Sequence, residues 1–331
     1  MIDLEKIKEA LYIEPEYRLK QTWRALFRYS ISSWDEITTL PLGLREKLNQ
    51  YCPIEIKTDE LIERNDTIKA RIILNDDLKV ETVLMRHKDS RNTVCVSSQV
   101  GCPLGCLFCA TGSMGFKRNI TTSEIVGQVL FFSRLLKKTK EKVTNVVFMG
   151  MGEPFLNYDS VIGAVKILND KYGFNIGARH ISISTIGILE GIEMLSRENL
   201  QVNLAISFHA PDNIIRSKLM PFNKTVPIEK LLTAVDSYIN KTKRQVMFEY
   251  LLIDGVNDSN DCALRLADLL NKPLYFLNLI IYNPTGVGMK PSSAGQVEKF
   301  KNILRKKGIK LSERYRFGQK IQAACGQLAV K

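Results

Sequence analysis

The chain has 331 residues, of which 45% are hydrophobic, and its formal net charge is +12. This length allows one large α/β domain with a smaller module, and the hydrophobic content excludes an intrinsically disordered chain. The positive charge favours a polyanionic partner such as nucleic acid, although a charge kept for solubility explains it equally well.

No targeting or membrane segment is expected. The first residues, MIDLEKIKEA, lack the apolar core of a secretory signal, and the apolar runs are shorter than the roughly 18 residues that a membrane span needs. We therefore expect a cytoplasmic protein without membrane contact. Its seven cysteines should stay reduced there, which favours metal or redox chemistry over a disulfide framework.

Residues 1–64 are predicted to form a helical, basic module. Apolar residues recur at three- and four-residue spacing in LEKIKEALY and YRLKQTWRALFRYS. Trp23 and Phe27 share this spacing and are expected to pack in the core. Residues 65–90 alternate apolar and polar positions around a turn at Asn75–Asp77, which predicts a β-hairpin connector.

Strands alternate with helices from residue 91 onward. Apolar runs such as VTNVVFMG, VNLAISFHA and LYFLNLIIY are separated by helical segments such as PIEKLLTAVDSYI. This order predicts an α/β fold with a parallel sheet, closed or partly closed into a barrel. Thr121 and Glu124 fit a capping box at a helix start, and Gly308 fits a helix C-cap. Functional loops of such sheets follow the carboxyl ends of the strands.

The stretch CVSSQVGCPLGCLFCATG holds four cysteines. Cys102, Cys106 and Cys109 are spaced C-x3-C-x2-C, so three thiolates of one loop could bind a [4Fe–4S] cluster and leave one iron open. Two other interpretations of these cysteines remain open. One is a structural zinc site completed by Cys95 or a histidine, and the other is an electron-transfer cluster with a remote fourth cysteine.

Polar residues and glycines follow several of the predicted strands. Glycines in MGMGEP, after VTNVVF, would let the backbone approach a ligand closely. Side chains at successive strand ends could line one binding pocket, although each alone is also an ordinary turn residue. The positions concerned are Gly152, Glu153, Ser184, Ser207, Phe208, His209 and Asn283.

The ordered motifs CVSSQVGC, CLFCATG, FMGMGEPFLN, SISTIG, AISFHAPDNIIR and AACGQLA resemble one family of the radical S-adenosylmethionine (SAM) superfamily. This is the RlmN family of adenosine C2 methyltransferases. The likeness runs from about residue 79 to the end of the sequence, and the N-terminal helices fit it. It implies a partial (β/α)6 radical-SAM barrel, with residues 1–64 as an RNA-binding module and residues 91–331 as the catalytic domain.

The resemblance also implies cofactors and residue roles. One [4Fe–4S] cluster would be held by Cys102, Cys106 and Cys109, and the seven strand-end residues would contact SAM. Cys325, in the tail segment AACGQLA, would carry the methyl group as methyl-cysteine. Cys95 would resolve the RNA adduct and form a transient disulfide with Cys325, and Glu81 would accept the C2 proton.

A radical route suits adenine C2, because this carbon has no nucleophilic lone pair for direct displacement on SAM. Two SAM molecules would be used per methyl group, one to methylate the Cys325 thiolate and one to generate the radical. The substrates implied are an adenosine in the peptidyl-transferase centre of 23S rRNA and the adenosine 3′ of the anticodon in tRNA. The protein is expected to be a monomer and to need an electron donor such as flavodoxin.

Candidate phosphate contacts are the basic N-terminal module, Lys117–Arg118 and the run 305–307. Two alternative functions remain open. A Cfr-type enzyme would methylate C8 instead. Pro154 and Val100 favour C2, whereas ISTIGI and RSKLMP are Cfr-like. A non-catalytic iron–sulfur RNA-binding protein would leave GMGEP and Cys325 unexplained. Cys52 and Cys262 match no motif and are expected to be incidental or buried thiols.

Overall fold

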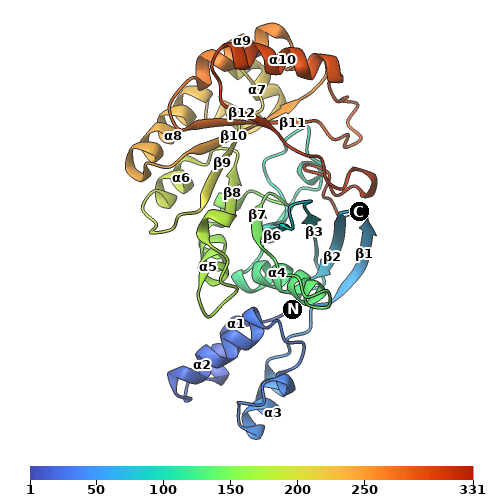
Figure 1. Cartoon of the computed structure of the whole chain (residues 1–331), viewed down its shortest axis with the longest axis vertical. Coiled ribbons are helices and arrows are strands. Elements are labelled where there is room, and N and C mark those ends of the chain that lie inside the picture. Colours follow the sequence, from blue (N-terminus) through green and yellow to red (C-terminus); the bar gives the residue numbers. More distant parts are fainter. Residues whose placement is uncertain (331) are drawn as a thin grey trace.

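The structure is a computed structural model that describes residues 1–330. Within this range ten strands form one mixed sheet, in the order β1-β2-β3-β4-β7-β8-β9-β10-β11-β12. The sheet curves into an open barrel with helices on its outer side (Figure 1). The predicted α/β fold with a partial barrel is therefore confirmed.

Neighbouring strands from β4 to β12 are parallel. These strands are β4 (Asn92–Val96), β7 (Asn145–Phe148), β8 (Ile181–Thr185), β9 (Asn203–Ser207), β10 (Val246–Leu252), β11 (Tyr275–Ile281) and β12 (Leu311–Glu313). The helices after them are α4 (Thr122–Lys137), α5 (Tyr158–Asn169), α6 (Leu189–Leu195), α7 (Asn213–Leu219), α8 (Ile228–Thr242), α9 (Asn260–Leu270) and α10 (Ala294–Lys306). The β-branched and aromatic strand residues are buried between these helices and the barrel interior.

Two predicted helix boundaries are confirmed. Thr121 and Glu124 form a reciprocal capping box at the start of α4. Gly308 follows α10 with φ +78°, a left-handed conformation that glycine adopts without steric cost. Local sequence signals thus define the start of α4 and the end of α10.

The N-terminal module contains α1 (Leu4–Ala10), α2 (Glu16–Trp23) and α3 (Leu42–Tyr51). Trp23 and Phe27 are buried, with ring centroids 5.3 Å apart, as expected for core residues. The prediction of helix up to residue 64 is wrong at its end, because Thr58–Arg64 forms strand β1. Pairing with β2 overrides the helical composition of this segment, and Asp59 on β1 binds Arg71 across the pair at 2.7 Å.

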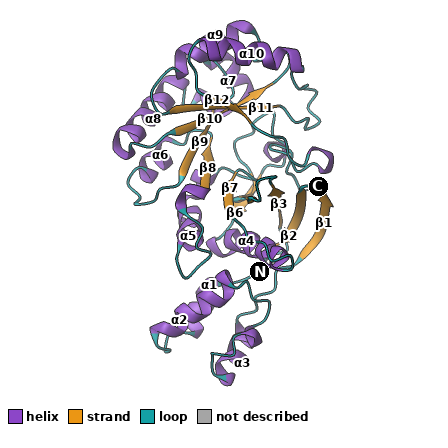
Figure 2. Ribbon diagram, in the orientation of Figure 1, coloured by secondary structure: helices purple, strands orange, loops and turns teal. Residues whose placement is uncertain are grey.

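The predicted hairpin consists of β2 (Thr67–Ile73) and β3 (Lys79–Arg86). It is part of the barrel wall rather than a separate connector, because β3 pairs antiparallel with β4 and brings Val83 opposite Cys95. Figure 2 shows that the last part of the chain, after β12, is mostly loop and lies beside β1, β2 and β3. No helix within residues 1–330 is both long and apolar enough to cross a membrane.

Candidate active site

The cysteine loop is held by the short strands β5 (Gln99–Gly101) and β6 (Phe116–Asn119). The Cys102 amide donates to the Gly115 carbonyl at 2.9 Å, and the Cys109 amide donates to the Cys106 carbonyl at 3.1 Å. A Cβ at Gly112 would lie 2.9 Å from the Cys106 oxygen. Only glycine therefore lets the chain fold back against this loop.

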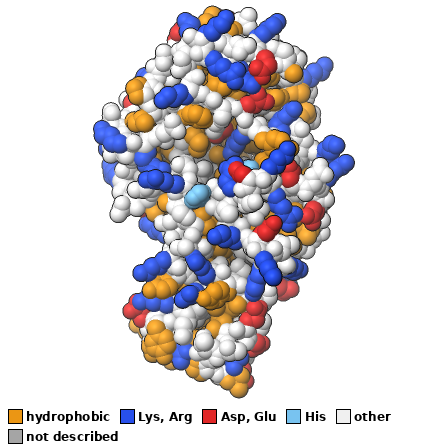
Figure 3. Space-filling view, in the orientation of Figure 1, with side chains coloured by type: hydrophobic (Ala, Val, Ile, Leu, Met, Phe, Trp, Pro, Cys, Tyr) orange, Lys and Arg blue, Asp and Glu red, His pale blue; other side chains and the backbone are white. Residues whose placement is uncertain are grey.

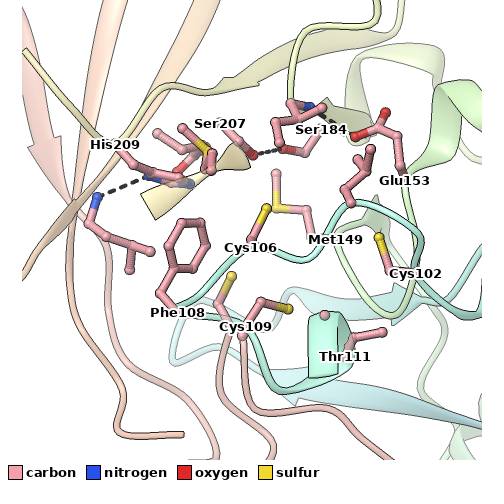
Figure 4. A pocket seen from close by; sticks show the side chains of 18 of the residues that line it. Cys102, Cys106, Phe108, Cys109, Thr111, Met149, Glu153, Ser184, Ser207 and His209 are labelled. Atoms are coloured by element: carbon pink, nitrogen blue, oxygen red, sulfur yellow. Dashed lines mark hydrogen bonds between the residues drawn. The ribbon is translucent and has the colours of Figure 1, made fainter. Parts of the chain in front are cut away.

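The three cysteines open into a cavity at the carboxyl ends of the strands, here called the carboxyl-end cavity. Cys102, Cys106 and Cys109 lie around the same space as Met149, and the hydroxyls of Ser184 and Ser207 lie 3.3 Å apart at its side (Figure 4). The predicted residues that line this cavity are Cys102, Cys106, Cys109, Gly152, Glu153, Ser184, Ser207, His209 and Cys325. Residues far apart in the sequence are thus brought together at the predicted edge of the sheet.

Burial sets the electrostatics of this cavity. The Glu153 carboxylate accepts from the amides of Phe155 and Ile186, and burial raises its pKa to about 7. Burial lowers the pKa of His209 to about 3, so this ring is neutral and accepts from the Leu251 amide. Burial also raises the pKa of the Cys102 thiol to about 11. A metal that binds this thiol must therefore displace its proton.

Two of the predicted strand-end residues lie elsewhere. Phe208 is fully buried and packs edge-to-face on Phe248, outside the lining of the cavity. The Asn283 side chain donates to the Cys325 carbonyl at 3.3 Å and accepts from Gln319. Asn283 therefore supports the tail, whereas Phe208 belongs to the core.

The donor set fits an iron–sulfur cluster better than a single ion. Three thiols share one cavity, and thiolates are the usual ligands of such clusters. Among residues 1–330, no group of three or more His, Cys, Asp or Glu side chains is placed to hold one metal ion. Cys95, the fourth ligand of the alternative zinc site, does not line the carboxyl-end cavity.

A second cavity, here called the amino-end cavity, opens at the amino ends of the strands. Thr93, Asn145, Ser182 and Asn203 line it from the first or second positions of β4, β7, β8 and β9. Cys95 also lines it, and burial raises the pKa of this thiol to about 12. The two cavities thus enter the barrel from opposite ends.

Cys325 lines both cavities. The tail that carries it is bonded to the cysteine loop, because the Ala110 amide donates to the Gly326 carbonyl at 2.7 Å and the Thr111 hydroxyl donates to the Leu328 carbonyl at 2.6 Å. Protein atoms surround the Cys325 sulfur and raise its pKa to about 11, yet it stays accessible from the cavities. Cys95 and Cys325 are both free thiols in this structure, so their disulfide stays a prediction.

Sequence reasoning missed two charged residues between the cavities. Glu249 and Arg314 line both of them, and the guanidinium lies 3.4 Å from the carboxylate. The positive charge of Arg314 lowers the pKa of the Cys325 and Cys95 thiols and so partly offsets their burial. A carboxylate inside the apolar strand VMFEYLL was the sequence signal for Glu249. Arg314 had no comparable signal.

Glu81 lines neither cavity. Its carboxylate is buried, binds the Lys69 ammonium at 2.9 Å and accepts from the Ala329 amide at 2.9 Å. It points to the same face of β3 as Val83, which does line the amino-end cavity. Glu81 therefore anchors the tail a short way beyond Cys325.

Replacement of Glu81 is expected to destabilise the fold. Glu81→Gln would leave the Lys69 ammonium, only 8% exposed, without its close carboxylate partner, and loss of a buried charge partner costs about 3 kcal/mol. The measurement is the free energy of unfolding in denaturant. Glu63→Gln is the matched control, because Glu63 is 58% exposed in its pair with Arg86 and should contribute less than about 1 kcal/mol. Equal losses in both variants would contradict this account.

Arg118, a predicted RNA contact, already forms ion pairs within the protein. Arg118 binds Asp76 at 2.7 Å and Glu124 at 2.8 Å, and Glu124 is the capping residue of α4. The two carboxylates neutralise the guanidinium, so Arg118 is a structural residue in this conformation. Its neighbour Lys117 is exposed.

The open parallel barrel and the three-cysteine loop at its carboxyl end define a radical SAM enzyme. Residues 96–267 match the sequence profile of the Radical SAM superfamily. A "Probable dual-specificity RNA methyltransferase RlmN" from Dictyoglomus thermophilum is 45% identical over 98% of this chain and 94% of its own length. A crystal structure of a radical SAM methyltransferase from Sphaerobacter thermophilus is 43% identical, with a TM-score of 0.94 over 99% of this chain and 97% of that chain.

A "Ribosomal RNA large subunit methyltransferase N" from Nitrosopumilus maritimus is also 45% identical, over 94% of this chain and 92% of its own length. The likeness therefore includes the N-terminal module as well as the barrel. The chain belongs to the RlmN family.

Proposed function

We propose that this chain methylates C2 of an adenosine in 23S rRNA and of an adenosine in tRNA, with Cys325 as the methyl carrier. The observation that supports this most is the place of Cys325 between two cavities. One cavity contains the three cysteines, and the other contains Cys95. A thiol that faces both can receive a group on one side and deliver it on the other.

In this proposal Cys102, Cys106 and Cys109 hold a [4Fe–4S] cluster. Gly152, Glu153, Ser184, Ser207 and His209 line the space beside it and contact SAM. The glycine backbone allows close approach, and the Glu153 carboxylate keeps acceptor capacity beyond its two amide bonds. When bound, the cluster and SAM supply the methyl group and the one-electron chemistry that activates it.

Cys325 holds the methyl group as a thioether; after this group has lost one hydrogen atom, its carbon bonds to C2, so that a methylene links the Cys325 sulfur to the RNA base. After the C2 proton is removed, Cys95 attacks this sulfur as a thiolate: an S–S bond forms, the S–C bond breaks, and its electron pair passes to the methylene carbon side, which takes up a proton and becomes the methyl group of the product. The pair returns to two thiols when an external dithiol reduces the disulfide. Arg314 supports both thiolates, because its guanidinium carries a positive charge beside them.

Removal of the C2 proton is assigned to Glu81. In the present conformation its carboxylate is held by Lys69 and the Ala329 amide. The tail segment that includes Ala329 must therefore release Glu81 before the carboxylate can accept a proton from the base. Such a release is local, because one hydrogen bond joins the carboxylate to the tail.

The helices of residues 1–51 are proposed to bind RNA away from the barrel. Exposed aromatic side chains gather there, with Tyr12 88% exposed and Tyr17 and Tyr29 both 52% exposed. The guanidinium groups of Arg18 and Arg24 lie over the rings of Tyr17 and Tyr29. Aromatic and guanidinium planes are surfaces on which unpaired bases stack.

The test is nucleoside mass spectrometry after incubation of the reconstituted protein with 23S rRNA or tRNA, SAM and a reductant. We expect 2-methyladenosine from both RNAs. A product with only 8-methyladenosine would assign the chain to the Cfr-type reaction instead. Intact RNA together with uncleaved SAM would overturn the enzymatic function.

A further inference from the structure

The amino-end cavity leads from the protein surface to both thiols that the proposed function assigns to the RNA steps. Cys95 and Cys325 line it, whereas the three cysteines of the loop line the other cavity. A hollow on the face shown in Figure 3 is bordered by Lys, Arg and His side chains. Because the cluster and SAM would fill the carboxyl-end cavity, a nucleobase that approaches Cys325 needs the amino-end cavity.

Three aromatic rings form a continuous row along this cavity. The Tyr315 and Phe317 centroids lie 4.7 Å apart, and Phe317 lies 4.7 Å from the ring of His87. Tyr315 is 65% exposed, although it follows directly on Arg314 beside the thiols. Phe317 and His87 are half-buried and pack edge-to-face, so they support the Tyr315 ring, whose exposed face offers a stacking surface for an unpaired base.

Basic side chains stand around the same cavity. Arg179 and Arg316 are exposed and line it, and neither has a carboxylate within ion-pair distance in the described part of the chain. Arg91 is exposed too, but it is paired with Asp89 at 2.8 Å. Unpaired guanidinium groups can bind phosphate oxygens without first breaking an internal ion pair.

We propose that the amino-end cavity is the entrance for an unstacked RNA nucleotide, with a base stacked on the exposed ring of Tyr315 and flanking phosphates bound by Arg179 and Arg316. This inference rests on the proposed function and names the surface that its RNA substrate uses. An unpaired nucleotide fits the site because it offers both an aromatic face and negative charge. A base that leaves its stack can then reach the sulfur of Cys325.

The stacking part is tested by RNA affinity, measured as fluorescence anisotropy of a labelled 23S rRNA fragment with the cluster-loaded protein. Tyr315→Ala is expected to weaken binding about tenfold or more, because one base–aromatic stack is lost. Tyr315→Phe keeps the ring and should restore most of the affinity. Equal weakening in both variants would show that the phenol hydroxyl, rather than stacking, is what matters, and would contradict the proposal.

The phosphate part is tested by the dependence of affinity on salt. The double variant Arg179→Gln with Arg316→Gln should reduce the slope of log affinity against log salt by about 1.4, because two contacts to a single strand are removed. The control removes two exposed lysines from the outer helix α8, as Lys230→Gln with Lys241→Gln. This control should keep the wild-type slope. A similar drop in both pairs would indicate net charge rather than a site.

Failure of this inference can be told apart from failure of the proposed function. If the wild-type protein methylates no RNA, the function itself is wrong. If it methylates RNA while Tyr315→Ala and the Arg179/Arg316 pair bind with wild-type affinity and salt slope, the function stands and the entrance lies elsewhere. The run 305–307 at the end of α10 would then be the next surface to test.

Discussion

Cys95→Ala is expected to stop turnover and to accumulate a covalent RNA–protein species while the iron content stays unchanged. Cys325 would still take up the methyl group and bond to the base, but no thiol would remain in the amino-end cavity to break the link. Cys95 lines this cavity and not the one with the three cysteines, so its loss should not disturb the cluster. The measurements are a denaturing gel with labelled RNA and the iron-to-protein ratio.

Two controls make the result specific. The double variant Cys95→Ala with Cys325→Ala should form no adduct, because the linking sulfur is absent. Cys262→Ala should behave as wild type, since this buried thiol lies on α9 and lines neither cavity. Loss of iron in Cys95→Ala would show instead that Cys95 is a ligand.

Arg314→Gln is expected to slow the reactions of Cys325 by about tenfold at neutral to mildly alkaline pH. The thiol has a pKa of about 11, and the guanidinium lowers this pKa by stabilising the thiolate. Its removal therefore raises the pKa further and leaves less thiolate at any pH below it. A rise of one pKa unit corresponds to about 1.4 kcal/mol and a tenfold smaller thiolate fraction. The measurement is the rate of alkylation of the Cys325 peptide between pH 7 and pH 10, read by mass spectrometry.

Two further variants test whether the change in the Cys325 pKa comes from charge. Arg314→Lys keeps the charge and should keep most of the rate. Glu249→Gln removes a negative charge that raises the pKa of Cys325, so it should increase the rate. If Arg314→Gln and Glu249→Gln shift the pH profile in the same direction, the effect comes from disturbed packing rather than from charge.

Much of the fold could be predicted from local patterns. The β-branched runs gave β7 to β11, and capping chemistry gave the start of α4. Strand β1 was missed because TDELIER has no apolar alternation of its own, and its pairing with β2 is stabilised by ions such as Asp59 and Arg71 that only the tertiary structure brings together. The hairpin was found, but its continuity with β4 is a long-range pairing that no local pattern encodes.

The carboxyl-end site could also be predicted, because once the parallel strands are recognised their carboxyl ends must lie at one edge of the sheet. The amino-end cavity was not predictable, since its lining comes from strand starts and from the tail. Ser182 and Asn203 are ordinary residues in sequence and meet only through the register of β8 with β9. Phe208 packs in the core and Asn283 is hydrogen-bonded to the tail, so neither lines the carboxyl-end cavity, and their contacts with SAM stay predictions.

The sheet and the tail that follows β12 differ in how firmly they are held. A ladder of backbone hydrogen bonds joins the ten strands of the main sheet, whereas the stretch that continues past β12 and carries Cys325 is held by single contacts such as those of Glu81, Thr111 and Asn283. Widening the sheet would break many bonds together, while moving this stretch breaks them one at a time. If Cys325 carries the RNA base as proposed, the tail can therefore shift with its bulky load without unfolding the scaffold that holds the three cysteines.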